Sequence, residues 1–233
     1  MARRLRVPLL VLSGVALTAL TAGCSLSGYG PSKEAQRTYT VHDKVTALSA
    51  TTHGGDIEIV PVDAGGSVKV TEKYVYNESK PTPAHSVKDG RLTLEAEDCG
   101  MGRRCEVGYR VLLPRNASVE LRTSGGDITV HGAAGGITAE TSGGDISVAD
   151  SAARTATART SGGDVDLALS AAPDKVSGRT SGGDVTIRLP KGSYAVDAST
   201  SGGDRKVSVP TDEDSAHEVT ARSSGGDVSV VRS

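Results

Sequence analysis

Apolar and polar residues alternate in one short pattern that recurs along most of this chain, always around a Gly-Gly pair. Counting back from the first glycine of each pair, the sixth residue is apolar, the fourth is apolar or small, and the second is Thr or Ser. After the pair come Asp, then nearly always Ile or Val, and another apolar residue two places later. Alternation with a period of two predicts a half-buried strand on each side of a Gly-Gly turn.

The aspartate of the turn makes the repeat easy to count. Gly-Gly-Asp occurs seven times, five of them as Thr-Ser-Gly-Gly-Asp. From Asp127 onward the aspartates lie 18, 19, 20, 20 and 23 residues apart. Units this short cannot bury a core alone, so the spacing predicts a stacked array. The seven aspartates, which we interpret as structural turn residues, are Asp56, Asp127, Asp145, Asp164, Asp184, Asp204 and Asp227.

Two all-β packings fit this pattern. In a β-solenoid, similar to a single-stranded β-helix, each unit of about 18–23 residues is a coil, and equivalent residues stack about 4.8 Å apart. In an antiparallel β-meander or sandwich, each Gly-Gly is a hairpin turn. Ala or Gly recurs four places before the glycine pair in most units, which favours a column of equivalent positions at a narrow corner. We therefore predict the solenoid and keep the meander as the alternative.

The residue just before the motif Thr tests the solenoid. It is Arg122, Glu140 and Arg159 in three successive units, so in a solenoid the glutamate would lie between two arginines on an outer face.

The stretch from residue 60 to 118 is less regular. Its segments 65–70 and 88–94 resemble degenerate repeats, and we predict three or four further units there.

The N-terminus predicts export. Three arginines precede an uncharged apolar run of about 16 residues, whereas a membrane span needs roughly 20. The run ends in Leu20-Thr21-Ala22-Gly23-Cys24, which resembles a bacterial lipoprotein lipobox, although Thr21 stands where Leu is usual. The alternative is a plain signal peptide followed by a chance cysteine. A lipobox implies that Cys24 is lipidated and anchors the chain to the extracytoplasmic face of the cell membrane.

We accordingly divide the chain into three parts. Residues 1–23 are the predicted lipoprotein signal peptide, 24–38 are the lipidated Cys with a flexible polar spacer, and 39–233 form the β-repeat domain. In an oxidising compartment the remaining cysteines, Cys99 and Cys105, are predicted to form a disulfide. A zinc or redox site is not supported, because there is no Cys-x-x-Cys and no nearby His.

Charge and composition limit the partners. The chain has 29 Gly, no Phe and no Trp, and a net charge of −2 that falls to −5 when the three arginines of residues 1–23 are removed. Because there is no basic surplus, we expect no nucleic-acid partner, and we expect membrane attachment to come from lipid.

The Thr-Ser-Gly-Gly-Asp-Ile/Val repeat, the lead-in at 112–119 and its echo at 189–194 together resemble the bacterial "putative adhesin" domain family of unknown function. The resemblance covers about residues 45–233. It implies a β-solenoid-like fold in envelope proteins, and it supplies no catalytic residues.

The aspartates offer the main chemical alternative. A column of carboxylates could bind calcium, because Ca²⁺ takes six to eight oxygen ligands. Each unit has only one acid, however, and an aspartate that accepts a nearby N–H to close its turn is the simpler interpretation. We predict no cofactor, with calcium as the weaker alternative.

An envelope enzyme acting on polysaccharide is the second class considered. It would need convergent acids or bases and aromatic sugar platforms, and neither is visible. The five histidines, which we expect at the surface, are scattered at His42, His53, His85, His131 and His217. We therefore predict a non-catalytic, lipid-anchored envelope protein that presents a β-repeat surface for adhesion or scaffolding, with an envelope protein or glycan as partner. An envelope-stress regulatory role is a further alternative.

Overall fold

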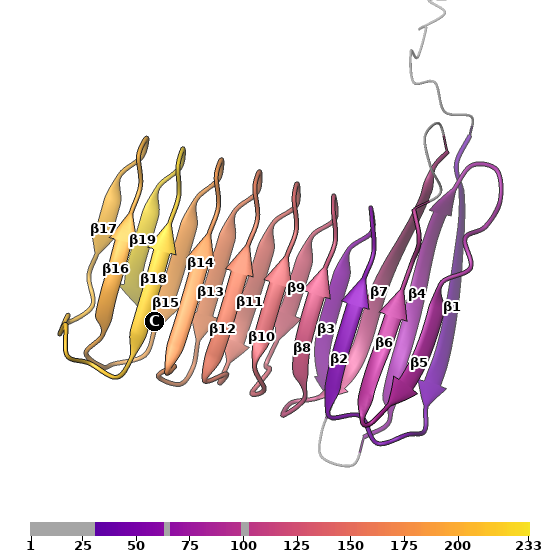
Figure 1. Ribbon diagram of the computed structural model, residues 1–233, viewed down its shortest axis with the longest axis horizontal. Helices are drawn as coiled ribbons and strands as arrows, with labels where there is room; N and C mark the ends of the chain where they lie inside the picture. Colours follow the sequence, from indigo (N-terminus) through magenta and orange to yellow (C-terminus); the bar gives the residue numbers. More distant parts are fainter. Residues whose placement is uncertain (1–30, 63–65, 99–102) are drawn as a thin grey trace, which may run out of the picture.

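The computed structural model describes residues 31–62, 66–98 and 103–233, and every regular element in them is a β-strand. The strands form a ten-stranded and a nine-stranded sheet that lie face to face as a long stack (Figure 1). No helix in the described ranges is long and apolar enough to cross a membrane. The apolar side chains of both sheets point inward and form one continuous core.

Each repeat unit is one coil of two strands. The strand before the Gly-Gly-Asp turn belongs to the nine-stranded sheet, and the strand after it belongs to the ten-stranded sheet. The first strands are β2 Ala47–Thr51, β8 Ser118–Arg122, β10 Ile137–Glu140, β12 Thr155–Arg159, β14 Lys175–Arg179, β16 Ala195–Ser199 and β18 Glu218–Arg222. The second strands are β3 Ile57–Val62, β9 Ile128–His131, β11 Ile146–Ser151, β13 Val165–Leu169, β15 Val185–Leu189, β17 Arg205–Val207 and β19 Val228–Arg232.

Equivalent strands of neighbouring coils pair in parallel, in the register that the repeat predicts. Ile137 of β10, for example, lies opposite Val119 of β8 and Ala156 of β12. The β-solenoid is therefore confirmed. The antiparallel meander is wrong for the repeat units, because their Gly-Gly turns join strands of different sheets rather than the two arms of a hairpin.

The column of small residues predicted from the sequence lies on the inner face of the nine-stranded sheet, where Ala139, Ala158, Gly178 and Ala221 are in register. Gly178 of β14 faces the ten-stranded sheet, where a Cβ at this position would lie 2.9 Å from Val185 and 3.1 Å from Val165. Larger side chains on one sheet thus require small ones opposite them, which explains why Ala and Gly recur at this slot.

The order of the coils along the stack is not the order of the sequence. The last unit, β18 and β19, lies between the β14/β15 coil and the β16/β17 coil. The coil that contains Asp204 is therefore the terminal one. Its Arg205, which occupies a slot that is otherwise Ile or Val, is exposed at this end and donates from Nε to the Ala198 carbonyl at 2.7 Å. A charged side chain on an open edge protects it against pairing with another sheet.

The region from 60 to 118 differs from the three or four further units that we predicted. It contributes one irregular coil, made of β6 Arg91–Glu95 and β7 Cys105–Pro114, which pair in parallel with β2 and β3. Its other strands, β4 Val68–Tyr76 and β5 Ala84–Lys88, are antiparallel to their neighbours. Together with β1 Lys33–Val41, which comes earlier in the chain, they close this end of the stack (Figure 1).

One hairpin in this region was predicted to be a degenerate repeat unit. β5 and β6 are joined by Asp89 and Gly90, which have φ values of 51° and 76°. An Asp-Gly pair with two positive φ values is typical of a two-residue hairpin turn. The segment 88–94 is thus a hairpin turn that leads into β6 rather than a coil of its own.

The predicted boundaries at the N-terminal end are tested only in part. β1 starts at Lys33, so the folded part begins earlier than the predicted Tyr39. Residues 1–23, Cys24 and Cys99 lie outside the described residues, so the signal peptide, the lipidation and the Cys99–Cys105 disulfide stay predictions.

The second glycine of each motif is required by close packing between coils. A Cβ on Gly144 would lie 2.1 Å from the Gly126 carbonyl oxygen of the neighbouring coil, and the equivalent distances in the other solenoid coils are 2.2–2.4 Å. The motif glycines are not needed for a left-handed backbone, since the positive-φ glycines among the described residues are Gly90 and Gly132. The first glycine is less confined, because a Cβ on Gly143 would be 3.7 Å from its nearest neighbour atom.

These distances predict that alanine at the second glycine lowers stability much more than alanine at the first glycine. Gly144→Ala should lower the free energy of unfolding by about 1–3 kcal/mol, because the methyl group forces two coils apart. Gly143→Ala should change it by less than about 0.5 kcal/mol. Urea unfolding followed by circular dichroism measures both, and equal effects would contradict the close-packing explanation.

Candidate functional site: the turn edge and the outer face of the nine-stranded sheet

The motif threonines form a hydrogen-bonded ladder along the edge where the turns stack. The buried Thr141 hydroxyl donates to the Gly126 carbonyl of the neighbouring coil at 3.0 Å. The same hydroxyl accepts from the N–H of Gly144 in its own turn at 3.3 Å. This pair of bonds recurs at Thr123, Thr160, Thr180, Thr200 and Ser223. Each hydroxyl thus joins two coils and closes one turn.

The aspartates form a second ladder beside the threonines. Asp127 accepts through Oδ1 from the backbone N–H of Asp145 in the next coil at 2.8 Å. Along the stack the acceptors are Asp56, Asp127, Asp145, Asp164, Asp184 and Asp227, with distances of 2.7–3.0 Å. The N–H comes from the neighbouring coil rather than from the aspartate's own turn, so the ladder links coils.

The aspartate column stays in water. All seven side chains are exposed, and neighbouring unit charges about 5 Å apart repel by only about 0.8 kcal/mol in water. A charge-assisted N–H bond offsets a repulsion of this size. Within the described residues, no group of three or more His, Cys, Asp or Glu is arranged to hold a metal ion, so the geometry gives the calcium alternative no support.

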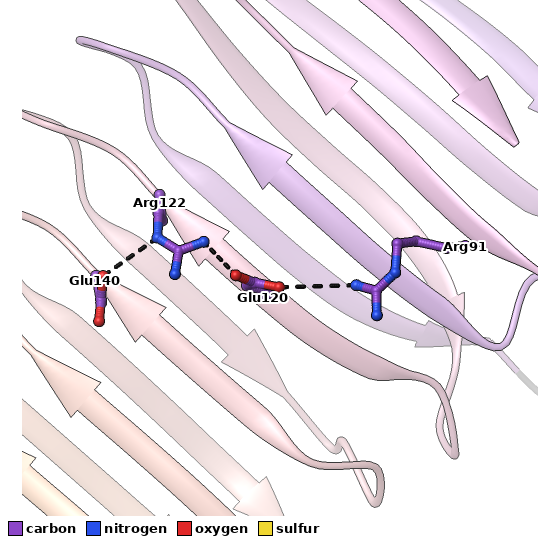
Figure 2. Close-up of polar contacts among 4 residues, drawn as sticks. All are labelled: Arg91, Glu120, Arg122 and Glu140. Atoms are coloured by element: carbon purple, nitrogen blue, oxygen red, sulfur yellow. Dashed lines mark hydrogen bonds and ion pairs between the residues drawn. The ribbon is translucent and has the colours of Figure 1, made fainter. Parts of the chain in front are cut away.

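An ion-pair chain crosses the outer face of the nine-stranded sheet (Figure 2). Glu120 lies between Arg91 at 3.8 Å and Arg122, and Arg122 contacts Glu140 at 3.2 Å. The predicted attraction between Arg122 and Glu140 is confirmed. Arg159 lies beside Glu140 in register but makes no ion pair with it in the described structure. Exposed pairs of this kind contribute about 0.2–1 kcal/mol each.

One buried acid was missed by the sequence analysis. Glu72 of β4 is 0% exposed and accepts a hydrogen bond from the Tyr74 hydroxyl. Burial, followed by the nearby Glu72 carboxylate, raises the pKa of the Tyr39, Tyr74 and Tyr109 hydroxyls, so all three stay protonated at neutral pH. The signal was present, because Glu72 falls in the apolar phase of the alternating segment Val68–Tyr76.

Four acids line a hollow near Tyr109, and two of them, Glu58 and Glu106, are paired with arginines. The hollow, of about 380 Å³, lies over Gly108 on the outer face of the ten-stranded sheet, with Glu58 and Glu106 at its sides. Glu58 is bound by Arg110, and Glu106 contacts Arg104 at 2.8 Å. The other two acids of the hollow, Asp56 and Asp127, accept backbone N–H bonds in the aspartate ladder.

The histidines do not gather at one place. His53 and His217 contact backbone carbonyls through Nδ1, at 3.0 Å to Ala96 and 2.8 Å to Pro173. His85 stacks on Tyr39 with ring centroids 4.5 Å apart, while His42 and His131 are exposed elsewhere. These placements agree with structural or surface roles.

A family model for the Toastrack DUF4097 domain matches residues 42–233, which is most of the chain and includes all the coils described above. The chain belongs to the Toastrack DUF4097 family. This confirms the resemblance predicted from the repeated Thr-Ser-Gly-Gly-Asp motif. A comparison of this Toastrack chain with curated proteins finds no match.

Solved structures similar to this Toastrack chain are distant in sequence. A "putative cell adhesion protein" from Clostridium sporogenes is 16% identical, with 86% of this chain and 100% of that chain covered and a TM-score of 0.46. A "putative adhesin" from Bacteroides fragilis is 15% identical, with 86% and 97% covered and a TM-score of 0.48. A "putative lipid binding protein" from Parabacteroides distasonis is 10% identical, with 86% and 96% covered and a TM-score of 0.35.

The threonine ladder gives a second test of stability. Thr141→Val keeps the side-chain shape but leaves the Gly126 carbonyl and the Gly144 N–H without partners. It should lower the free energy of unfolding by about 1–3 kcal/mol. The control is Thr157→Val on the exposed face of β12, for which we expect a change within about 0.5 kcal/mol. Urea midpoints that fall equally in both variants would show that the ladder bonds add nothing.

Proposed function

We propose that this Toastrack chain is a non-catalytic protein of the bacterial cell envelope, held at the extracytoplasmic face of the membrane by lipid on Cys24. Its solenoid presents a rigid polar surface to an envelope protein or glycan, for adhesion or scaffolding. The observation that supports this most is the pair of ladders, which fix every coil to the next through side chain and backbone together. Such a stack holds its outer side chains at constant spacing.

The chain length near the proposed anchor fits this arrangement. Between Cys24 and the first residue of β1, Lys33, stand eight residues, which span at most about 28 Å when fully extended. A lipid on Cys24 would therefore keep the antiparallel end of the stack within reach of the bilayer, while the coils with Asp184 and Asp204 lie toward the far end.

The chemistry of the outer faces supports a binding role over catalysis. The outer positions of the nine-stranded sheet carry mainly Ser, Thr, Arg and Glu, and its glutamates Glu120 and Glu140 are engaged by arginines. Glu72, the buried acid, is sealed in the core. Outer side chains that can donate and accept hydrogen bonds suit a polar partner such as a glycan or a hydrophilic protein.

The anchor is tested by substitution of the lipidated cysteine. Cys24→Ser should move the protein from the membrane fraction to the soluble or secreted fraction, because the sulfur that carries the lipid is lost. The matched control is Cys105→Ser, which removes a different sulfur and should leave the protein in the membrane fraction. Immunoblots of fractionated cells measure both. Retention of Cys24→Ser in the membrane would overturn the lipid anchor.

The surface role is tested by photo-crosslinking on intact cells. A photoreactive residue at Thr157, on the outer face of the nine-stranded sheet, should capture partner material that is then analysed for protein, carbohydrate and phosphate. Ser147, on the outer face of the ten-stranded sheet, is the matched position on the other side. Capture of nothing from either position would contradict a surface that engages a partner.

A further inference from the structure

Three arginines line up beside the turn edge. Arg159, Arg179 and Arg222 end the adjacent strands β12, β14 and β18, and they lie directly opposite one another in register. Parallel strands are about 4.8 Å apart, so three positive charges follow one another at that interval. With the turn residues Ser161, Ser181 and Ser224, they line a shallow groove of about 350 Å³.

The positive charge of this arginine groove is not balanced by the protein. Arg222 pairs with Asp197, but neither Arg159 nor Arg179 makes an ion pair within the described part of the chain. The nearest acid in the column, Glu140, is engaged by Arg122. No Asp or Glu lines the groove. Like charges at this spacing repel one another, so the row is unfavourable in the absence of an anion.

Arg179, the central arginine, also has an unused donor. Its Nε is buried and has no hydrogen-bond partner. A buried donor without an acceptor is unfavourable, and a ligand oxygen that drew the guanidinium into the groove would satisfy it. The neighbouring Thr160 and Thr180 hydroxyls are already committed to the ladder. The exposed hydroxyls of Ser161, Ser181 and Ser224 are not engaged in any such bond and provide further donors.

We propose that the arginine groove binds phosphate groups of a linear envelope polymer that runs along the solenoid axis. The oxygens of a tetrahedral phosphate diverge, so one phosphate group can accept hydrogen bonds from guanidinium groups on two neighbouring strands and from a serine hydroxyl together. A row of three arginines suits a ligand with several anionic groups better than a single ion. The proposal deepens the proposed function and rests on it for the source of the ligand.

Two other polyanions fit the groove less well. A membrane surface would call for apolar side chains that insert beside the basic ones, and here the neighbours of the arginines are Ser and Thr. The mature chain, with a net charge of −5, repels polyanions over most of its surface, so attraction is confined to the groove. Nucleic acid is also a phosphate polymer, but a chain that is exported, as predicted, would be separated from the nucleic acid of the cytoplasm.

The test measures binding of the purified full chain to a synthetic linear glycerol phosphate oligomer by isothermal titration calorimetry. Arg159→Gln with Arg179→Gln should weaken binding at least tenfold, and added salt should weaken binding to the unchanged protein. The matched control is Arg154→Gln with Arg188→Gln. This control removes the same charge from arginines that pair with Asp174 and Asp166, and it should alter affinity less than twofold.

Further measurements distinguish between the possible ligands and test whether a loss of binding comes from misfolding. Arg159→Lys with Arg179→Lys keeps the charge, and its binding should fall between those of the unchanged protein and the Gln variant. Inorganic phosphate should bind at least tenfold more weakly than the oligomer. Absence of oligomer binding, equal loss in the control, equal binding of inorganic phosphate, or binding only to phosphatidylglycerol vesicles would each overturn the proposal. Because the assay needs no membrane anchor, its failure is distinguishable from failure of the Cys24 experiment.

Discussion

The close approach of backbone to backbone at the turns constrains the rest of this structure. The second glycine of each motif lies so near the carbonyl of the next coil that even a methyl group would not fit, as the 2.1 Å distance at Gly144 illustrates. That approach lets the Thr141 hydroxyl reach across to the neighbouring turn and lets Asp127 accept from the backbone of Asp145. Because glycine, threonine and aspartate each serve the same contact, the motif repeats in residue identity and not only in polarity.

A fixed spacing between coils also determines what the outer surface can do. Side chains at equivalent positions form straight columns, so a charge repeated in the sequence becomes a row in space. Where the column contains Glu140, Arg122 is neutralised. Further along, Arg159 and Arg179 follow one another without an acid between them. Whether this face is neutral or basic therefore depends on the one residue that precedes the motif Thr or Ser in each coil.

Much of the solenoid could be predicted from the sequence, since alternation on both sides of Gly-Gly-Asp identifies the strands and their buried faces, and the recurrence of Ala or Gly at one slot favours parallel stacking. The antiparallel end could not, because Val68–Tyr76 alternates like any strand and pairing direction leaves no trace in a period of two. The position of the last coil could not be predicted either, because the core residues of β14, β16 and β18 are so similar that any two of these strands could pair. The groove also escaped notice, because the unpaired state of Arg179 depends on a side chain's surroundings.

The placement of the last coil has a consequence for how the chain reaches its native state. Residues 218–232 follow the β16/β17 coil in the sequence, yet they occupy an interior slot between β14/β15 and β16/β17. The coil that holds Asp204 cannot dock on its final neighbour until those residues are available, so the array cannot be completed one unit at a time in sequence order. Residues 218–232 therefore hold the terminal coil to the rest of the stack. A chain that lacked them would keep all the residues of β16 and β17, but these strands would have lost β18 and β19, with which they pair.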